Sequence, residues 1–401
     1  MDCKKYIQQM RMVQANILSF INEDKNTEEY FQILTNLFDD LNYNNDKQKL
    51  RIILNMIAKI VNNHHRVSDF FCKIEKILMF LKDDIINIYS NSEIFDIFKR
   101  NKRILLFLIQ EKMIIVDEYI IKIFTKNPYS NKYIFENYLQ YFSPEIQPLR
   151  KQNWFPKLKG IFEENNFDEE MGKELPENFY ENRKAGENHN PICKIIQNDS
   201  IEEFISYINQ NNLPYNAKIE PSIYETNSFL IKKQTESKRR FLFGSSTNNY
   251  GVSLIEYAAF FGSNKIFKFL YENGAKISHS LMLFVIHGNS ADLFQYTKND
   301  VNNFFLLAME SIKCHHNEMF NNIQSNYLEN ENLYSKDFVA QGLKYYNYAF
   351  IENSYINKST FNDLCKYNHY TLVDILLKNK DIDVNEIILF VVIIQFCVLK
   401  C

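Results

Sequence analysis

The sequence predicts an all-α protein in which an N-terminal helical domain precedes an array of short helix pairs. Residues 1–143 hold one proline and no glycine, so they are nearly free of residues that interrupt helices. Apolar residues there recur at spacings of three and four, the pattern of an amphipathic helix, as at Ile7, Met10, Val13 and Ile17. Farther along, residues 250–278 read as two short helices, each ended by a glycine.

Length and charge narrow the classes of function. The length of 401 residues suggests two or three domains. The formal net charge of −3 provides no overall electrostatic attraction to nucleic acid or anionic membranes. Seven scattered cysteines indicate free thiols in a reducing compartment. The charged start, MDCKKY, indicates no secretory signal, and no stretch reaches membrane-spanning length. We expect a cytoplasmic protein, with the nucleus as the alternative, and neither nucleic acid nor a membrane as partner.

The predicted N-terminal domain, 1–143, continues with the same helical spacing at Leu50, Ile53 and Ile57 and again from Phe70 onward. Residues 94–114 read as a helix pair with Asn101 at the turn, which is a candidate degenerate repeat.

Residues 144–190 change character. They contain four prolines, the first glycines of the chain and an acidic run around Glu163–Glu170. We interpret this stretch as an irregular linker between two helical halves, with Trp154 anchoring it on a neighbouring domain.

The stretch 250–278 contains residues typical of helix starts, close helix packing and helix ends. Ser253 followed by Glu256 is a capping-box signature, and the small pair Ala258-Ala259 lets another helix approach closely. Gly262 and Gly274 stand where the two helices end and a left-handed residue is favoured.

These residues resemble an ankyrin repeat. Ser253–Glu256 stands where that family has Thr-Pro-Leu-His, with Leu254 in place of the proline and Glu256 in place of the histidine. The other family positions follow in register at Ala258-Ala259, Gly262, Phe267–Leu270 and Gly274-Ala275. Since one repeat cannot bury its apolar face alone, we expect about six divergent repeats over 191–385.

The whole chain resembles a large expanded group of ankyrin-repeat proteins from anaerobic protist parasites. The resemblance is carried by NNHHR (Asn62–Arg66), SIYETNSFL (Ser222–Leu230), SLIEYAAFFGS (Ser253–Ser263) and KCHHNE (Lys313–Glu318). It implies an all-helical interaction protein with no known reaction. The apolar tail, 386–401, departs from the repeat pattern. We expect it to pack on the last repeat around Leu372 and Leu376, and a peripheral membrane anchor is the alternative.

The chain lacks the common phosphate-binding, dinucleotide-binding, nucleophile-elbow and zinc-protease motifs. Cys314-His315-His316 and the pair Cys365 and His369 offer too few ligands at zinc spacing, so we interpret them as turn and core residues. We therefore expect no enzyme activity, cofactor, metal or small-molecule substrate.

A basic cluster invites a second interpretation. It comprises Lys232, Lys233, Lys238, Arg239 and Arg240. Such a cluster suits nuclear import or a nucleic-acid patch. We favour an exposed insertion with solvated charges.

The resemblance also implies a binding face. In ankyrin repeats the residues just before the inter-helix turn point into the concave groove. The matching positions here are Phe260, Phe261, Ile286, His287, Lys313, Cys314, Lys344, Lys366 and Tyr367. They form a stripe with an aromatic start and a basic end, which suits an acidic or phosphorylated partner segment. We expect the lysines to be exposed, whereas Phe260 and Phe261 are either exposed or part of the core.

The expected function is thus a non-enzymatic scaffold that binds another protein. Two alternatives are an enzyme with its site in residues 1–190 and a nuclear adaptor that uses the basic cluster.

Overall fold

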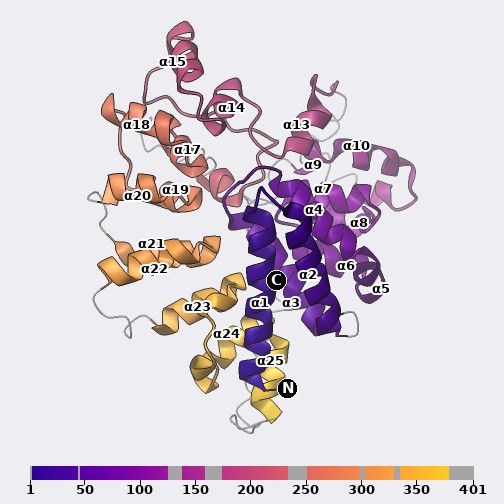
Figure 1. The fold of residues 1–401 in the computed structure, drawn as a ribbon. Coiled ribbons are helices and arrows are strands. Elements are labelled where there is room, and N and C mark those ends of the chain that lie inside the picture. Colours follow the sequence, from indigo (N-terminus) through magenta and orange to yellow (C-terminus); the bar gives the residue numbers. More distant parts are fainter. Residues whose placement is uncertain are drawn as a thin grey trace. The chain divides into compact units, whose positions relative to one another are not determined.

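The computed structural model describes residues 2–43, 46–124, 138–158, 174–233, 251–298, 303–328 and 335–378. Within them the protein is all-helical, as predicted (Figure 1). Their only bridge of β type pairs Lys218 with Ser253. No helix in these ranges combines the length and apolarity needed to cross a bilayer.

The chain divides into two compact units. Unit 1 comprises Met1–Lys59 and Phe304–Cys401, and unit 2 comprises Ile60–Asn303. This division does not follow the predicted domains, because both ends of the predicted linker 144–190 fall inside unit 2. Helix α3 (Lys47–Asn63) begins in unit 1, and its last residues belong to unit 2.

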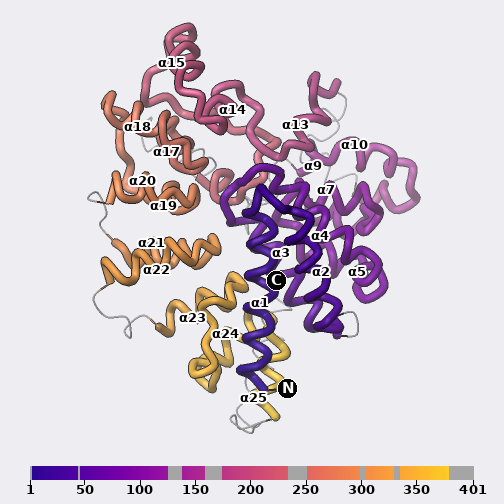
Figure 2. The backbone as a smooth tube through the Cα atoms, in the orientation of Figure 1, coloured from indigo at the N-terminus to yellow at the C-terminus, as the bar shows by residue number. Residues whose placement is uncertain are grey.

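Unit 1 places the N-terminal helices beside the last helix pairs. Besides α3 it contains α1 (Cys3–Asn22), α2 (Thr27–Leu41), α21 (Phe304–Cys314), α22 (Asn317–Tyr327), α23 (Ser335–Tyr345), η5 (Tyr348–Phe350), η6 (Asn353–Tyr355), η7 (Lys358–Thr360), α24 (Phe361–Lys366) and α25 (Tyr370–Lys378). The predicted apolar stripe of α1 is buried from Ile7 to Phe20. Helix α1 packs on α2 (Figure 2) and also contacts η5 and η6.

Unit 2 begins with short helices and ends with helix pairs. After α3 come α4 (Phe70–Phe80), α5 (Lys82–Ile88), α6 (Asn91–Phe98), α7 (Lys102–Gln110), α8 (Glu118–Phe124), α9 (Tyr138–Tyr141), α10 (Ser143–Ile146), η2 (Gln147–Lys151), η3 (Phe155–Leu158) and α13 (Phe179–Ala185). The pairs are formed by α14 (Pro191–Gln197), α15 (Ile201–Gln210), α17 (Leu254–Phe261), α18 (Asn264–Glu272), α19 (Leu281–Gly288) and α20 (Ala291–Thr297). The helix pair predicted for 94–114 exists as α6 and α7, and Asn101 caps α7.

The described parts of the predicted linker are ordered. Arg183 of α13 is 2% exposed and donates to both oxygens of Glu145, at 2.7 and 2.8 Å. It also donates to the Tyr141 carbonyl at 2.9 Å, while the Tyr141 hydroxyl donates to the Arg183 carbonyl at 2.9 Å. This reciprocal contact ties α13 to α9 and α10. Within the expected linker, α10 and α13 are therefore helices that contact each other, whereas residues 174–178 are exposed and not helical.

The helix pairs share one turn geometry. Each inter-helix turn contains one residue in the left-handed conformation: Asp199, Gly262, Asn289, His315, Tyr346 and Asn368. In five turns the next residue donates its backbone N–H to the carbonyl five residues earlier, from Ser200, Ser263, His316, Asn347 and His369. This is the Schellman arrangement, which satisfies carbonyls at the end of the first helix. The predicted role of Gly262 is confirmed.

Three of the junctions between successive pairs share one register. In each of three junctions a side chain just after the left-handed residue contacts a carbonyl of the preceding pair. The contacts are Ser263 Oγ to Ile196 O at 2.5 Å, Asn347 Nδ2 to Ile312 O at 2.9 Å and His369 Nε2 to Leu343 O at 2.8 Å. Each acceptor lies three residues before the left-handed residue of its own turn. First helices also pack on first helices, α14 on α17 and α17 on α19 in unit 2, and α21 on α23 in unit 1.

Glu256 links one helix pair to the next. Its Oε2 accepts from the Ser253 backbone N–H at 2.8 Å, and Ser253 Oγ accepts from the Glu256 backbone N–H at 3.4 Å, which confirms the predicted capping box. Its other oxygen accepts from the hydroxyls of Ser278 and Ser280, at 2.5 and 3.2 Å. The Ser253 hydroxyl also donates to Oε2 at 2.9 Å, and a carboxylate with four such donors is well satisfied in a buried position.

Candidate functional site

The aromatic start of the predicted binding stripe lies in the core of unit 2. Phe260, Ile286 and His287 are each at most 2% exposed. The Phe229 ring stacks on His287 with centroids 4.1 Å apart, and Phe260 stacks on the same imidazole at 5.6 Å. The structure thus places Phe260 in the core, which is the second of the two expected alternatives, and corrects the expected groove position of Ile286 and His287. Phe261 is half-buried.

Lys313 departs from its predicted exposure. Its Nζ lies 2.5 Å from a Glu310 carboxylate oxygen, and the two side chains are 16% and 17% exposed. Burial disfavours the charged form of Lys313, but the adjacent Glu310 carboxylate, Cys314 and Tyr345 together outweigh this effect and raise the pKa of Lys313. The pair is therefore held as an ion pair with no net charge to offer a partner. Cys314, also in the predicted stripe, is fully buried.

The lysines at the basic end of the stripe that lie after Cys314 are exposed, as predicted, in unit 1. Lys344 and Lys366 are exposed, and each ammonium lies 5.2 Å from the ring centroid of the tyrosine that follows it, Tyr345 or Tyr367. Lys59 of α3 lies 5.9 Å from the Tyr345 ring. Such distances permit cation–π attraction. We call these five residues the basic–tyrosine surface.

Hydrogen bonds hold the turn that carries Lys344 and Tyr345 in register with the turn that carries Lys366 and Tyr367. The Tyr346 hydroxyl donates to the Tyr367 carbonyl, and the buried His369 imidazole contacts the Leu343 carbonyl at 2.8 Å. Because a carbonyl only accepts, His369 carries its proton on Nε2, and Nδ1 accepts from the Tyr348 hydroxyl at 3.1 Å. Burial lowers the pKa of His369 to about 4. Both ring nitrogens are thus used in packing, in agreement with the predicted core role.

The predicted turn role of Cys314-His315-His316 is confirmed. His315 is the left-handed residue of its turn, with φ of 61°, and His316 donates its N–H to the Ser311 carbonyl at 3.0 Å. Burial lowers the pKa of His315 to about 4 and raises that of the Cys314 thiol.

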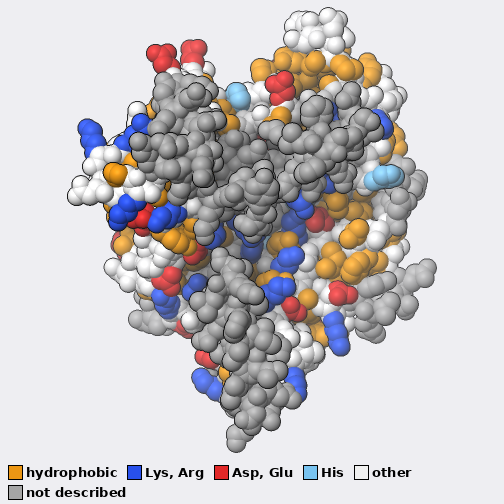
Figure 3. Space-filling view, turned by 180° about the vertical axis from the view of Figure 1, so that it is seen from behind, with side chains coloured by type: hydrophobic (Ala, Val, Ile, Leu, Met, Phe, Trp, Pro, Cys, Tyr) orange, Lys and Arg blue, Asp and Glu red, His pale blue; other side chains and the backbone are white. Residues whose placement is uncertain are grey.

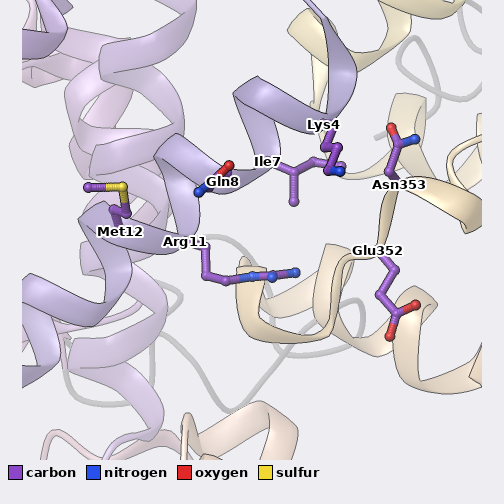
Figure 4. Close-up of a pocket in the computed structure, with 7 residues that line it drawn as sticks. All are labelled: Lys4, Ile7, Gln8, Arg11, Met12, Glu352 and Asn353. Atoms are coloured by element: carbon purple, nitrogen blue, oxygen red, sulfur yellow. The ribbon is translucent and has the colours of Figure 1, made fainter.

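A groove in unit 1 was not apparent from the sequence. It has a volume of about 530 Å³ and is lined by Lys4, Ile7, Gln8, Arg11, Met12, Glu352 and Asn353 (Figure 4). Arg11 donates to the carbonyls of Tyr348 and Ile351, both at 3.1 Å, and so joins α1 to η5 and to the residue that follows it. The lining has no hydroxyl, thiol or imidazole, the groups that serve as nucleophile and base in most hydrolytic sites. The polar residues on the exposed face of α1 were the only sequence signal near this groove.

A second cluster missed from the sequence lies in unit 2. Lys102 and Arg103 of α7 are each 3% exposed, and they donate to the carbonyls of Ile223 and Lys184. Arg103 also contacts the Glu75 carboxylate at 2.5 Å. Nearby charged groups are Arg66, Glu187 and Glu225, and we call all six residues the charged junction. Two stretches quoted for the family resemblance, Asn62–Arg66 and Ser222–Leu230, meet in it.

The remaining predicted features are placed only in part. Lys232 is exposed, and the Lys233 ammonium lies 5.8 Å from the Phe229 ring. Lys238, Arg239 and Arg240, like the tail 386–401, lie outside the described residues. On the face shown in Figure 3, basic and acidic side chains of the described residues are interspersed.

Comparison with known proteins adds no assignment. No protein-family model, curated protein or solved structure matches the chain.

Proposed function

We propose that the chain is a non-enzymatic, ankyrin-type repeat scaffold that binds another protein. The observation that carries this proposal is the repeated turn unit: a left-handed residue followed by a residue that bonds to the preceding helix pair in constant register. Helix pairs that stack through neighbour contacts form extended arrays, and the known use of such arrays is to present a long surface to a partner.

The basic–tyrosine surface is the binding region that the structure supports best. Lys344 and Lys366 are exposed at corresponding positions of consecutive turns, and Tyr345 and Tyr367 offer aromatic area beside them. Tyrosine and basic groups are enriched among residues that dominate protein interfaces. Lysine ammonium groups also form strong charge-assisted hydrogen bonds with carboxylates and phosphates. The expected ligand is therefore an acidic or phosphorylated segment of another protein.

The enzyme alternative is less well supported. It places a site in residues 1–190, where the carboxylates of Glu75 and Glu145 contact Arg103 and Arg183, two buried arginines that hold helices together. Such contacts have a sufficient structural explanation.

Charge reversal tests the proposal. The variant Lys344→Glu/Lys366→Glu is compared with Lys336→Glu/Lys378→Glu, which changes exposed lysines on α23 and α25 outside the surface. Each full-length protein is used to probe arrays of acidic, phosphorylated and basic peptides and to capture partners from its native cells. The first variant should lose its acidic ligands and strongest partner with an unchanged circular dichroism melt, and the control should keep them. Retention by both variants would exclude this surface.

A further inference from the structure

A small polar cavity in unit 2 lies where three stretches of the chain meet. It has a volume of about 50 Å³ and is lined by Asn216, Lys218, Ser253, Lys276 and Ser278. The first two residues follow α15, Ser253 precedes α17, and the last two lie between α18 and α19. The lining therefore consists of polar and positively charged residues.

Two contacts hold the walls of this cavity together. Lys218 and Ser253 form the β-type bridge, and Asn216 Oδ1 accepts from the Lys276 backbone N–H at 2.6 Å. Because Oδ1 is the acceptor, the other amide atom, Nδ2, is a donor. Within the described ranges Nδ2 has no hydrogen-bond partner. Asn216 thus brings an unused donor to the cavity.

The two lysines give the cavity an excess of positive charge. Lys218 is half-buried and Lys276 is exposed, and among the described residues neither ammonium has an ion-pair or hydrogen-bond partner. The carboxylate beside the cavity is that of Glu256, which accepts from the Ser253 and Ser278 hydroxyls at 2.9 and 2.5 Å. Two ammonium groups against this one carboxylate leave one excess positive charge, so the cavity attracts an anion.

We propose that this cavity binds one phosphate group through the ammonium groups of Lys218 and Lys276 and through Asn216 Nδ2. The serine hydroxyls, which donate to Glu256, form the wall behind the ligand. The volume gives room for a few water-sized groups of about 10–15 Å³ each, which suits one phosphate and is too small to enclose a nucleoside. The site lies in unit 2 and is independent of the partner-binding surface proposed in unit 1.

The number of donors favours a phosphate group over a carboxylate. A phosphate ester carries about −1.5 to −2 charge at pH 7 and presents three strong acceptor oxygens. Two ammonium groups and one amide supply one donor for each of these oxygens, and ammonium–phosphate hydrogen bonds are strengthened by charge. A carboxylate has two oxygens and a single charge, so it matches this set of donors less well.

Calorimetric titration of the full-length protein with inorganic phosphate tests the site. Lys218→Gln and Lys276→Gln should each weaken binding about tenfold, because each removes one ammonium–anion attraction at a partly exposed position. Asn216→Asp should abolish binding, since the new carboxylate still accepts from the backbone but replaces the amide donor with a negative charge. Lys194→Gln/Lys265→Gln, which changes exposed lysines on α14 and α18, is the matched control and should bind phosphate as the natural protein does.

A second titration identifies the source of the phosphate group. It uses a pool of phosphoserine peptides and the same pool without phosphate. Phosphopeptides that bind more tightly than inorganic phosphate would indicate a phosphorylated partner protein, whereas equal or weaker binding would indicate free phosphate.

Two controls keep a failure of folding apart from a failure of binding. The circular dichroism melt of each variant should match that of the natural protein, and Lys218→Arg/Lys276→Arg, which keeps both charges, should retain binding. The site would be overturned by equal phosphate affinity of the natural protein and Lys218→Gln/Lys276→Gln. It would also be overturned if neither inorganic phosphate nor the phosphopeptides bound the natural protein saturably.

Discussion

Asn347 joins three segments of unit 1 through one buried side chain. It is fully buried, and its Nδ2 donates to the carbonyl of Ile312 at 2.9 Å. Its Oδ1 accepts from the Gln14 side chain of α1 at 2.7 Å, while Gln14 Oε1 accepts from the Tyr348 backbone N–H at 2.5 Å. The substitution Asn347→Ala therefore removes the partner of a buried amide and of a buried carbonyl at once.

The magnitude follows from these two groups. A buried polar group left without its partner costs about 1–2 kcal/mol, so the substitution should lower the free energy of unfolding by roughly 2–4 kcal/mol. Urea denaturation of the full-length protein measures this, with Asn326→Ala as the control, because Asn326 is exposed and bonds only within α22. A loss no larger than that of the control would refute the reasoning.

A double-mutant cycle sharpens the test. If Gln14 and Asn347 act on each other, Gln14→Ala combined with Asn347→Ala should cost less than the sum of the single changes, by about 0.5–3 kcal/mol. Strict additivity would mean that the contact between α1 and the turn contributes nothing.

Two further predictions concern the backbone and a buried charge. Gly262→Val should lower the melting temperature clearly. A residue with a side chain pays about 1–2 kcal/mol to adopt the left-handed conformation, and the added Cβ would lie 3.2 Å from the Gly288 carbonyl oxygen. An unchanged calorimetric melt would contradict the turn geometry. Arg183→Met should cost roughly 3–5 kcal/mol by leaving Glu145 unpaired in a low-dielectric site, and adding Glu145→Gln should restore part of it. Equal urea midpoints for the single and double variants would show that the ion pair is unimportant.

The sequence was sufficient for local features and insufficient for pairing between distant segments. The capping box at Ser253 and the left-handed Gly262 follow from residue type and spacing alone. Tyr346 and His315 occupy the same turn position. Histidine is enriched in the left-handed conformation whereas tyrosine is not, so residue type did not indicate Tyr346. The pairing of Lys313 with Glu310 is an i, i+3 contact that the sequence contains.

Other features depend on contacts that no local pattern encodes. The burial of His287 requires Phe229, which lies 58 positions earlier in the chain and in a segment without repeat character. The charged junction likewise combines cations from the first third of the chain with acceptors that lie, except for Glu75, beyond residue 180. The sequence does not distinguish a buried lysine or arginine from a solvated one, because burial depends on the partners that the fold brings to the side chain.

The turn contacts also determine where this chain can change in length. The inter-helix turns are two or three residues long in all six cases. The Schellman bond fixes the geometry of five of them, and in three a side chain also contacts the preceding pair. The connections from one pair to the next are unequal: eight residues separate α18 from α19, whereas residues 211–253 separate α15 from α17. Insertions and deletions should therefore accumulate at the end of each pair opposite the turns, where a loop can lengthen without disturbing the stacking of its neighbours.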